Sequence, residues 1–184
     1  MLFTELETDR LMLKNISSED RHFVLQQFSN NEVNRYLFDA EPTTDLLSAD
    51  EIVAFYNQPE PRNQHRWIII RKKDGVKIGT CGFHCWDKSN GRCDIGYDLH
   101  PDFWGNGYMS EAMKVILNFA ENKMDIKQIN ACIYTENHKS IRLIEKHGFV
   151  HHGQMKDEVF RGEKYAHKVF IFELSKIEDI KSIK

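Results

Sequence analysis

The most informative stretch of this chain is Pro101-Asp-Phe-Trp-Gly-Asn-Gly-Tyr-Met-Ser-Glu-Ala-Met113. Its glycines, Gly105 and Gly107, follow a strand-like segment at 92–99 and directly precede an amphipathic run. The apolar residues of that run have the spacing of one helical face: Met109, Ala112, Met113, Ile116, Leu117, Ala120 and Met124. Glycine allows close approach to the backbone, and the first turn of a helix leaves N–H donors unpaired at the positive end of its dipole. The order of strand, glycine loop and helix therefore favours a phosphate-binding site.

The loop does not match two common nucleotide-binding motifs. A nucleoside-triphosphate loop has Lys and then Ser or Thr after its last glycine, whereas this chain has Tyr108 and Met109. A dinucleotide-binding fingerprint has Gly or Ala where this chain has Ser110, and an acidic residue at the end of the next strand, a role that Glu136 fits only weakly. On the loop alone, a glycine turn without a ligand stays an alternative.

Length and charge narrow the class of protein. With 184 residues, of which 41% are hydrophobic, the chain suits a single domain spanning residues 1–184. A net charge of -3 with mixed signs gives no basic face for nucleic acid. The N-terminus does not resemble a signal peptide, and the longest strongly apolar stretch is only 67–70. We therefore expect a cytoplasmic protein without nucleic-acid or membrane contacts; a homodimer is compatible with the sequence, which does not determine the oligomeric state.

The cysteines are interpreted as free thiols rather than metal ligands. In Cys81-Gly-Phe-His-Cys-Trp86, strand alternation places residues 81, 83 and 85 on one face and His84 and Trp86 on the other, which separates the potential ligands. A chain without an export signal also indicates a reducing compartment. We therefore expect no metal, and expect small buried hydrophobic side chains at Cys81, Cys85, Cys93 and Cys132.

The remaining sequence predicts a sheet with helices on it. Turn signals lie at Asp74-Gly75, at 89–91 and at Arg161-Gly162. Strand-like runs occupy 10–14, 67–71, 77–86, 92–99, 128–134, 152–160 and 165–174. Helical segments are expected from 17–20 to about 28, at 49–56, after the glycine loop, and from 138 to about 147, with 176–184 a polar helix end or a frayed tail. The strand, helix and strand of 92–134 must form a parallel, right-handed unit in an otherwise antiparallel sheet.

Four ordered segments carry a resemblance to a known family. They are Glu7-Thr-Asp-Arg-Leu-Met-Leu13, Asp94-Ile-Gly-Tyr-Asp-Leu99, Pro101 to Ala112, and Glu136-Asn-His-Lys-Ser-Ile-Arg-Leu-Ile-Glu-Lys-His-Gly-Phe149. With these segments in this order, the chain resembles the GNAT N-acetyltransferase superfamily, nearest to the ribosomal-protein N-terminal acetyltransferases of the RimJ/RimL type. The resemblance implies a mixed α/β (α+β) fold with a mostly antiparallel sheet of six to seven strands and about four helices. One parallel strand pair would splay apart to admit acetyl-CoA.

The resemblance also assigns the residues that would bind acetyl-CoA. Backbone groups of Tyr97, Asp98 and Leu99 would pair with the pantetheine like an added strand. Asn137 and Ser140 match positions that approach the cofactor in relatives, although Asn137 is equally well explained as a helix N-cap. The pyrophosphate would lie on the backbone of the loop, whose residues are Trp104, Gly105, Asn106, Gly107, Tyr108, Met109 and Ser110. Trp104 and Met109 depart from the family pattern, which has Arg or Gln and a small residue there, so the backbone would be the main anion ligand.

Acetyl transfer requires an amine that has lost its extra proton, because an ammonium group has no lone pair. Asp94 stands where relatives often carry Glu and is the first candidate base; Asp98, further along the same strand face, is the second. A solvated or ion-paired carboxylate is the alternative for Asp94. Ile144 stands where many relatives have a Tyr acid, so Ser140 is the candidate to protonate the thiolate, against simple solvation. A backbone N–H near Leu99 would bind the oxyanion.

The expected function is therefore an N-acetyltransferase that moves the acetyl group of acetyl-CoA directly to a primary amine in a ternary complex. The acceptor would be a peptide N-terminus, an amino acid or a small amine, and an acidic acceptor pocket would favour a polyamine or an antibiotic. A non-catalytic acyl-CoA-binding module is the alternative from another class. Aromatic residues would line the acceptor pocket or, more simply, belong to the core: Tyr36, Phe38, Trp67, His84 and Trp86.

Overall fold

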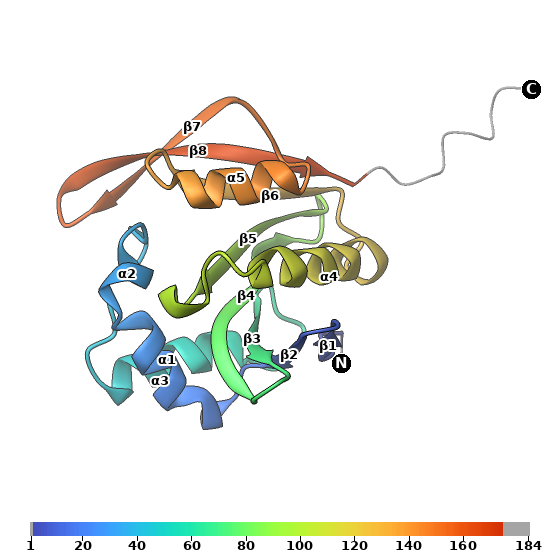
Figure 1. The fold of residues 1–184 in the computed structure, drawn as a ribbon. Helices are drawn as coiled ribbons and strands as arrows, with labels where there is room; N and C mark the ends of the chain where they lie inside the picture. The colour runs from blue at the N-terminus through green and yellow to red at the C-terminus, as the bar shows by residue number, and fades with distance from the viewer. Residues whose placement is uncertain (1, 175–184) are drawn as a thin grey trace, which may run out of the picture.

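The structure, a computed structural model, describes residues 2–174 (Figure 1). Within this part, eight strands form one sheet in the order β1-β2-β3-β4-β5-β6-β8-β7. All neighbouring strands are antiparallel except β5 and β6, which confirms the predicted parallel pair. The strands are β1 (Leu6–Glu7), β2 (Leu11–Asn15), β3 (His65–Arg71), β4 (Val76–Asp87), β5 (Arg92–Leu99), β6 (Gln128–Tyr134), β7 (Val150–Phe160) and β8 (Glu163–Glu173).

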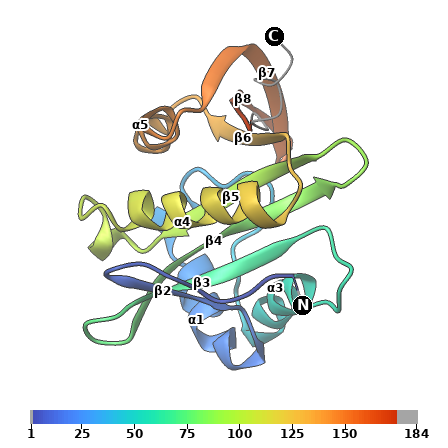
Figure 2. The same ribbon diagram turned by 90° about the vertical axis from the view of Figure 1, so that its right-hand side faces the viewer.

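Helices cover the sheet and create two hydrophobic cores. One core packs α4 and α5 against the sheet, and the other packs α1 and α3 against side chains such as Ile68 and Ile70. Figure 2 shows α1 and α3 together, apart from α4 and α5. The α-helices are α1 (Arg21–Phe28), α2 (Asn31–Asn34), α3 (Leu46–Tyr56), α4 (Tyr108–Lys123) and α5 (His138–Lys146), with short 3-10 helices η1 (Ser18–Asp20) and η2 (Pro101–Phe103).

The structure adds two short elements to the predicted set. The two-residue strand β1 brings the sheet from the expected six or seven strands to eight within residues 2–174, and α2 brings the α-helices from about four to five. Neither is long enough to show a hydrophobic period in the sequence. Helix α3 also begins three residues before the predicted start at 49, because Asp45 caps it by accepting a hydrogen bond from the Ser48 N–H at 2.9 Å. The predicted tail at 176–184 lies outside the described residues.

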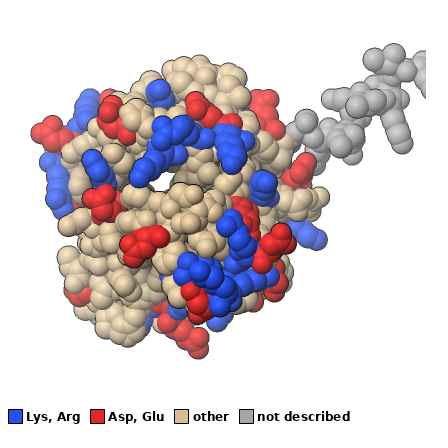
Figure 3. Space-filling view, viewed as in Figure 1, with Lys and Arg blue, Asp and Glu red and all other residues tan. Residues whose placement is uncertain are grey.

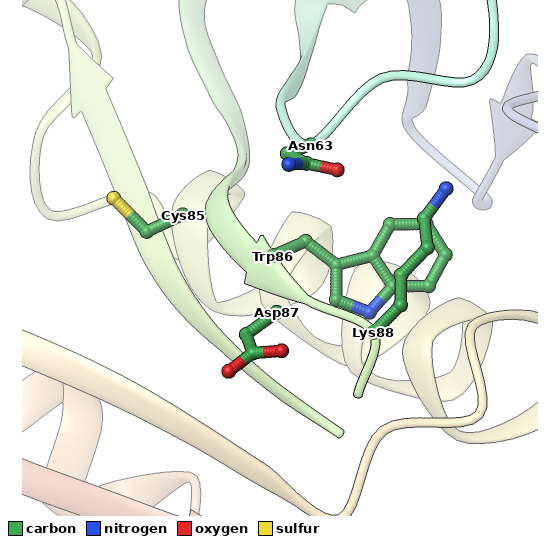
Figure 4. A pocket seen from close by; sticks show the side chains of 5 residues that line it. All are labelled: Asn63, Cys85, Trp86, Asp87 and Lys88. Carbon is green, nitrogen blue, oxygen red and sulfur yellow. The ribbon is translucent and has the colours of Figure 1, made fainter. Parts of the chain in front are cut away.

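Cys81 and Cys93 are buried as predicted, whereas a bulge in β4 makes the prediction wrong for Cys85. Cys85 has a φ of 52°, and the pairing of β4 with β5 shifts register between His84 and Asp87. The extra residue resets the alternation of side chains, so Trp86 turns into the core and Cys85 is exposed. In Figure 4 the Cys85 side chain points away from Trp86, whose ring lies beneath Lys88. Cys132 is exposed as well.

Two further findings concern the described part of the chain. Among residues 2–174, the structure holds no cluster of side chains suited to bind a metal ion. No helix in the same range combines the length and the apolar character that a membrane crossing requires.

Candidate functional site

The site begins where β5 and β6 separate. These strands pair only at Arg92↔Gln128, Cys93↔Ile129 and Asp94↔Asn130, whereas β5 stays paired with β4 on its other side as far as Leu99. Beyond Asp94, the edge of β5 that faces β6 is therefore open. A gap between parallel strands exposes backbone N–H and C=O groups to a ligand.

Backbone alternation selects which residues face this gap. The His100 N–H donates to the Ile78 carbonyl at 2.8 Å. Because backbone groups alternate in direction along a strand, those of Asp98, two residues earlier, also point toward β4. Those of Tyr97 and Leu99 consequently face the gap, and the Leu99 carbonyl accepts a hydrogen bond from Trp104 Nε1 at 2.7 Å. Of the three residues predicted to pair with pantetheine, Tyr97 and Leu99 have suitably directed backbone groups and Asp98 does not.

The loop after β5 has the geometry of an anion cradle. Gly105 and Gly107 both have a φ of 76°, in the left-handed region that strains any residue with a side chain. Gly107 is the N-cap of α4, so the N–H donors of the first helical turn meet no capping side chain from it. A groove of about 560 Å³ adjoins this turn, and Ser110, Lys114 and Lys146 line it.

Arg10, the residue before β2, holds the loop in place through its side chain. Its NH1 donates to the Asn106 carbonyl at 3.1 Å, its Nε pairs with Glu111 at 2.6 Å, and its guanidinium lies 4.6 Å from the centre of the Tyr108 ring. Lys114 and Lys146, in contrast, form no ion pair within residues 2–174. With Arg10 they outnumber Asp9 and Glu111, the acidic residues that also line the groove, and the helix N-terminus adds positive potential. Figure 3 shows an opening through the molecule near this region, with Lys and Arg side chains along its upper rim.

Each predicted loop residue lies at this helix start, but the side chains differ in what they can offer. Tyr108 and Met109 are buried in the core, each 8% exposed, so only their backbone can meet a ligand. The Ser110 hydroxyl is committed to His147 Nε2 at 2.9 Å. Trp104 connects the loop to β5, and Lys139 Nζ lies 4.1 Å above the centre of its ring.

A pair of hydroxyl groups spans the gap between β5 and α5. The oxygens of Tyr97 and Ser140 lie 2.6 Å apart in a hydrogen bond. Asn137 holds the start of α5 by accepting a hydrogen bond from the Ser140 N–H at 3.2 Å, as expected for the N-cap. Burial raises the pKa of Tyr97 well above its usual value, so its phenol keeps its proton. Both hydroxyls are therefore available as proton donors.

Asp98 is not a free base. Its carboxylate accepts hydrogen bonds from Gln27 at 2.8 Å and from the Thr80 hydroxyl, and Arg66 lies 3.5 Å away. The residue is 8% exposed. Burial raises the pKa of Asp98, while the charge of Arg66 and the hydrogen bonds of Thr80 and Gln27 oppose this effect. The carboxylate is thus engaged in a buried polar network under α1.

Asp94 lies at the apex of the gap and is partly exposed. Asn130 Nδ2 donates to Asp94 Oδ1 at 3.1 Å, which leaves the second oxygen without a hydrogen bond from the described residues. Across the sheet, Asp94 pairs in register with His84. Sequence reasoning had placed His84 only among pocket-lining aromatics; the turn at 89–91 was the signal that could have paired it with Asp94. Cys93, the residue before Asp94, is buried in the core with α4.

Aromatic side chains border the side of the gap that faces away from α4. Phe38 stacks on Tyr165 with 3.8 Å between ring centres and meets the edge of Tyr134 at 4.9 Å. Tyr36 also approaches Tyr134, at 5.9 Å. Trp67 and Trp86, by contrast, belong to the core with α4. Three of the five predicted residues therefore border the site, namely Tyr36, Phe38 and His84, and two do not.

Comparison with known proteins identifies a family. Residues 10–150 match the model of a family described as "Acetyltransferase (GNAT) domain". The uncharacterized N-acetyltransferase p20 of Bacillus licheniformis is 34% identical over 175 residues, which cover 94% of this chain and 97% of the relative. The uncharacterized N-acetyltransferase YoaA of Bacillus subtilis is 33% identical over 172 residues, covering 92% and 96%.

Solved structures share the fold at lower identity. The ribosomal-protein acetyltransferase RimL in complex with coenzyme A superposes with a TM-score of 0.84 and 18% identity, covering 93% of this chain and 98% of that one. A spermidine N-acetyltransferase from Vibrio cholerae, in complex with coenzyme A and spermine, superposes with a TM-score of 0.80 and 18% identity, covering 92% and 98%. This likeness confirms the predicted mixed sheet with its splayed strands.

Proposed function

The chain belongs to the GNAT family of acetyltransferases and is an acetyl-CoA-dependent N-acetyltransferase, and we propose that it transfers the acetyl group directly to a primary amine in a ternary complex. The proposed acceptor is a peptide N-terminus, an amino acid or a small amine. We further propose that the protein belongs to the RimJ/RimL-like branch and acts in the cytoplasm. The ordered sequence segments at 7–13, 94–99, 101–112 and 136–149 support the branch, and RimL shares the fold.

The open edge of β5 next to the glycine loop carries this proposal. The backbone of Tyr97 and the N–H of Leu99 face the gap and would hydrogen-bond the pantetheine as an added strand would. The pyrophosphate would lie on the N–H groups between Gly105 and Ser110 at the start of α4. Lys114 and Lys146 line the adjoining groove and would neutralise the remaining phosphate of coenzyme A.

The residues around the apex would supply the chemistry. Asp94, directly or through water, would take the proton of the acceptor ammonium. The hydroxyl of Ser140, bonded to that of Tyr97, would return a proton to the departing thiolate. Asp98 would support the site as a buried partner of Arg66 rather than as a base.

Thiol release from acetyl-CoA tests the proposal. The purified protein is assayed with peptides, amino acids, small amines and polyamines, and the mass of each product is determined. We expect release of coenzyme A and a product heavier by one acetyl group for at least one class of amine. Tight binding of acetyl-CoA with no turnover on any amine would instead favour a non-catalytic acyl-CoA-binding module.

A further inference from the structure

We propose that His84 is a catalytic residue whose imidazole takes the proton from the acceptor ammonium, and that Asp94 acts through it. This inference rests on the proposed transfer to an amine and adds a group that the sequence had placed only in the pocket wall. Asp94 then acts on the imidazole through its charge and does not take the proton itself.

The register of the sheet places His84 beside Asp94. His84 on β4, Asp94 on β5 and Asn130 on β6 are successive partners across three strands, so their side chains lie in one row on one face. The Asp94↔Asn130 pair is the last between β5 and β6, and the His84↔Asp94 pair immediately precedes the bulge in β4. The row therefore lies at the apex of the gap, where the thioester would end.

The imidazole ring of His84 lies next to Gly96. A Cβ atom added to Gly96 would lie 3.2 Å from His84 Cε1 and 3.4 Å from Arg66 NH2. The imidazole thus lies over the Gly96 backbone, at the first residues of β5 that are unpaired with β6. Within residues 2–174 neither ring nitrogen has a hydrogen-bond partner, and the side chain is partly exposed. The ring is free to meet an incoming amine.

Charged side chains from four segments surround the ring. Arg66 on β3, Asp94 on β5, Asp39 after α2 and Lys156 on β7 all act on His84. Burial, and then the positive charge of Arg66, lower the pKa of His84, while Asp94 and Asp39 raise it; the net direction is downward. At neutral pH the imidazole is therefore uncharged and holds a lone pair for a proton. The carboxylate of Asp94 opposite would stabilise the imidazolium once formed.

The protons balance in this scheme. The acceptor R–NH3⁺ gives one proton to His84, and its freed lone pair forms the C–N bond to the acetyl carbon as the C–S bond breaks. The Ser140 hydroxyl delivers its proton to the departing thiolate, and the second proton, lost by the nitrogen, returns to Ser140 and restores its hydroxyl. His84 releases its proton to solvent before the next turnover, so the net products are the amide, coenzyme A and one proton.

The test is the pH profile of kcat/KM for the wild type, His84→Gln and Asp94→Asn. The acceptor should have a pKa of about 10.4, as a lysine-type amine does, so that its own ionisation lies above the assayed range. For the wild type, kcat/KM should rise with pH through the pKa of His84 and then level off. His84→Gln should lack this rising limb of the pH profile. Its kcat/KM should be about 10²- to 10⁴-fold below that of the wild type, the range of general-base catalysis. Asp94→Asn should keep the limb at lower pH, because Asp94 raises the pKa of His84.

Controls separate this role from a structural one. The exposed His22 of α1 supplies a matched variant, His22→Gln, which should behave like the wild type. Binding of coenzyme A should be unchanged in every variant, and added imidazole should partly restore His84→Ala. A limb that persists in His84→Gln and disappears in Asp94→Asn would overturn the proposal and leave Asp94 as the direct base. Absence of turnover in the wild type with every amine would instead reject the proposed function.

Discussion

At the residue scale, the paired hydroxyls of Tyr97 and Ser140 are the groups that we propose as the proton source for the thiolate. They face each other at 2.6 Å where the open edge of β5 meets α5, and Asn137 fixes Ser140 at the first turn of its helix. We expect Ser140→Ala to lower kcat by roughly 10²-fold, the lower end of general-acid catalysis. Binding of coenzyme A, measured by calorimetry, should change little, since the substitution leaves the proposed pyrophosphate and pantetheine contacts in place.

A conservative variant separates the two hydroxyls. Tyr97→Phe removes the phenol and keeps the backbone groups that face the gap, so a smaller loss of kcat is expected if Ser140 is the donor. Should Tyr97→Phe lose as much as Ser140→Ala, the two hydroxyls act as one relay. If neither variant affects kcat, the thiolate takes its proton from water.

The buried pair of Asp98 and Arg66 governs stability rather than chemistry. Their side chains are only 5% and 14% exposed. Asp98→Asn keeps the shape but leaves the Arg66 charge buried without its partner, a change that typically costs about 3–5 kcal/mol. We expect the free energy of unfolding, measured in urea, to fall by an amount of this order.

An exposed ion pair provides the comparison. Glu41 and Arg161 pair at 2.5 Å on the surface, with side chains 61% and 64% exposed. Because water screens such a pair, Glu41→Gln should leave the free energy of unfolding near that of the wild type. A loss for Glu41→Gln as large as that for Asp98→Asn would contradict this account of burial.

At the element scale, the glycine loop contributes both to stability and to the proposed binding of coenzyme A. A second glycine outside the loop allows the two contributions to be measured separately. Gly105 and Gly75 both have positive φ, 76° and 69°, and a Cβ on either would meet no atom within 4 Å. Alanine at either position should therefore cost about 1–2 kcal/mol through backbone strain alone. Only Gly105→Ala should also weaken the binding of coenzyme A in calorimetry, because Gly75 lies in the β3–β4 turn. Equal affinities in the two variants would argue against a pyrophosphate on this loop.

The elements that sequence patterns predicted well are those with a long period or a strong turn signal. Helix α4 shows its apolar face over four turns, and Asp74-Gly75 and Arg161-Gly162 form the turns expected of them. The bulge at Cys85 carries no such signal, because a single inserted residue follows from the fit of β4 against β5. The inward turn of Trp86 could not be read from alternation alone for the same reason.

At the scale of the whole molecule, the predicted pieces came together, but the contacts across the gap did not follow from the sequence. Asp94, Ser140 and the loop at 104–110 all lie around the opening between β5 and β6, as the family resemblance implied. The network that occupies Asp98 joins residues from α1, β3, β4 and β5: Gln27, Arg66, Thr80 and Asp98. Such long-range partners depend on how the helices pack on the sheet, which no local pattern records.

Two further long-range contacts, an aromatic stack and an ion pair, lie on one side of the opening. The segment after α2 lies beside the β7–β8 hairpin where strands β5 and β6 diverge (Figure 1). Phe38 stacks on Tyr165 at 3.8 Å, and Glu41 pairs with Arg161 at the tip of the hairpin. This bridge borders the face of the sheet that carries His84 and Asp94, so it would help shape the acceptor pocket.

Removing the stacked ring should therefore affect the acceptor and spare the cofactor. An aromatic pair contributes about 0.5–1.5 kcal/mol beyond its buried area to holding this side of the gap in place. Phe38→Ala should therefore raise the KM of the amine by up to roughly tenfold, the effect of losing all of this energy from acceptor binding. The KM of acetyl-CoA should stay unchanged, because its proposed contacts lie at α4 and at the open edge of β5. Phe55, on α3 and 48% exposed, supplies the control Phe55→Ala, for which both KM values should match the wild type. If Phe38→Ala raises both KM values together, the bridge holds the whole gap in shape, and acceptor selectivity must come from elsewhere.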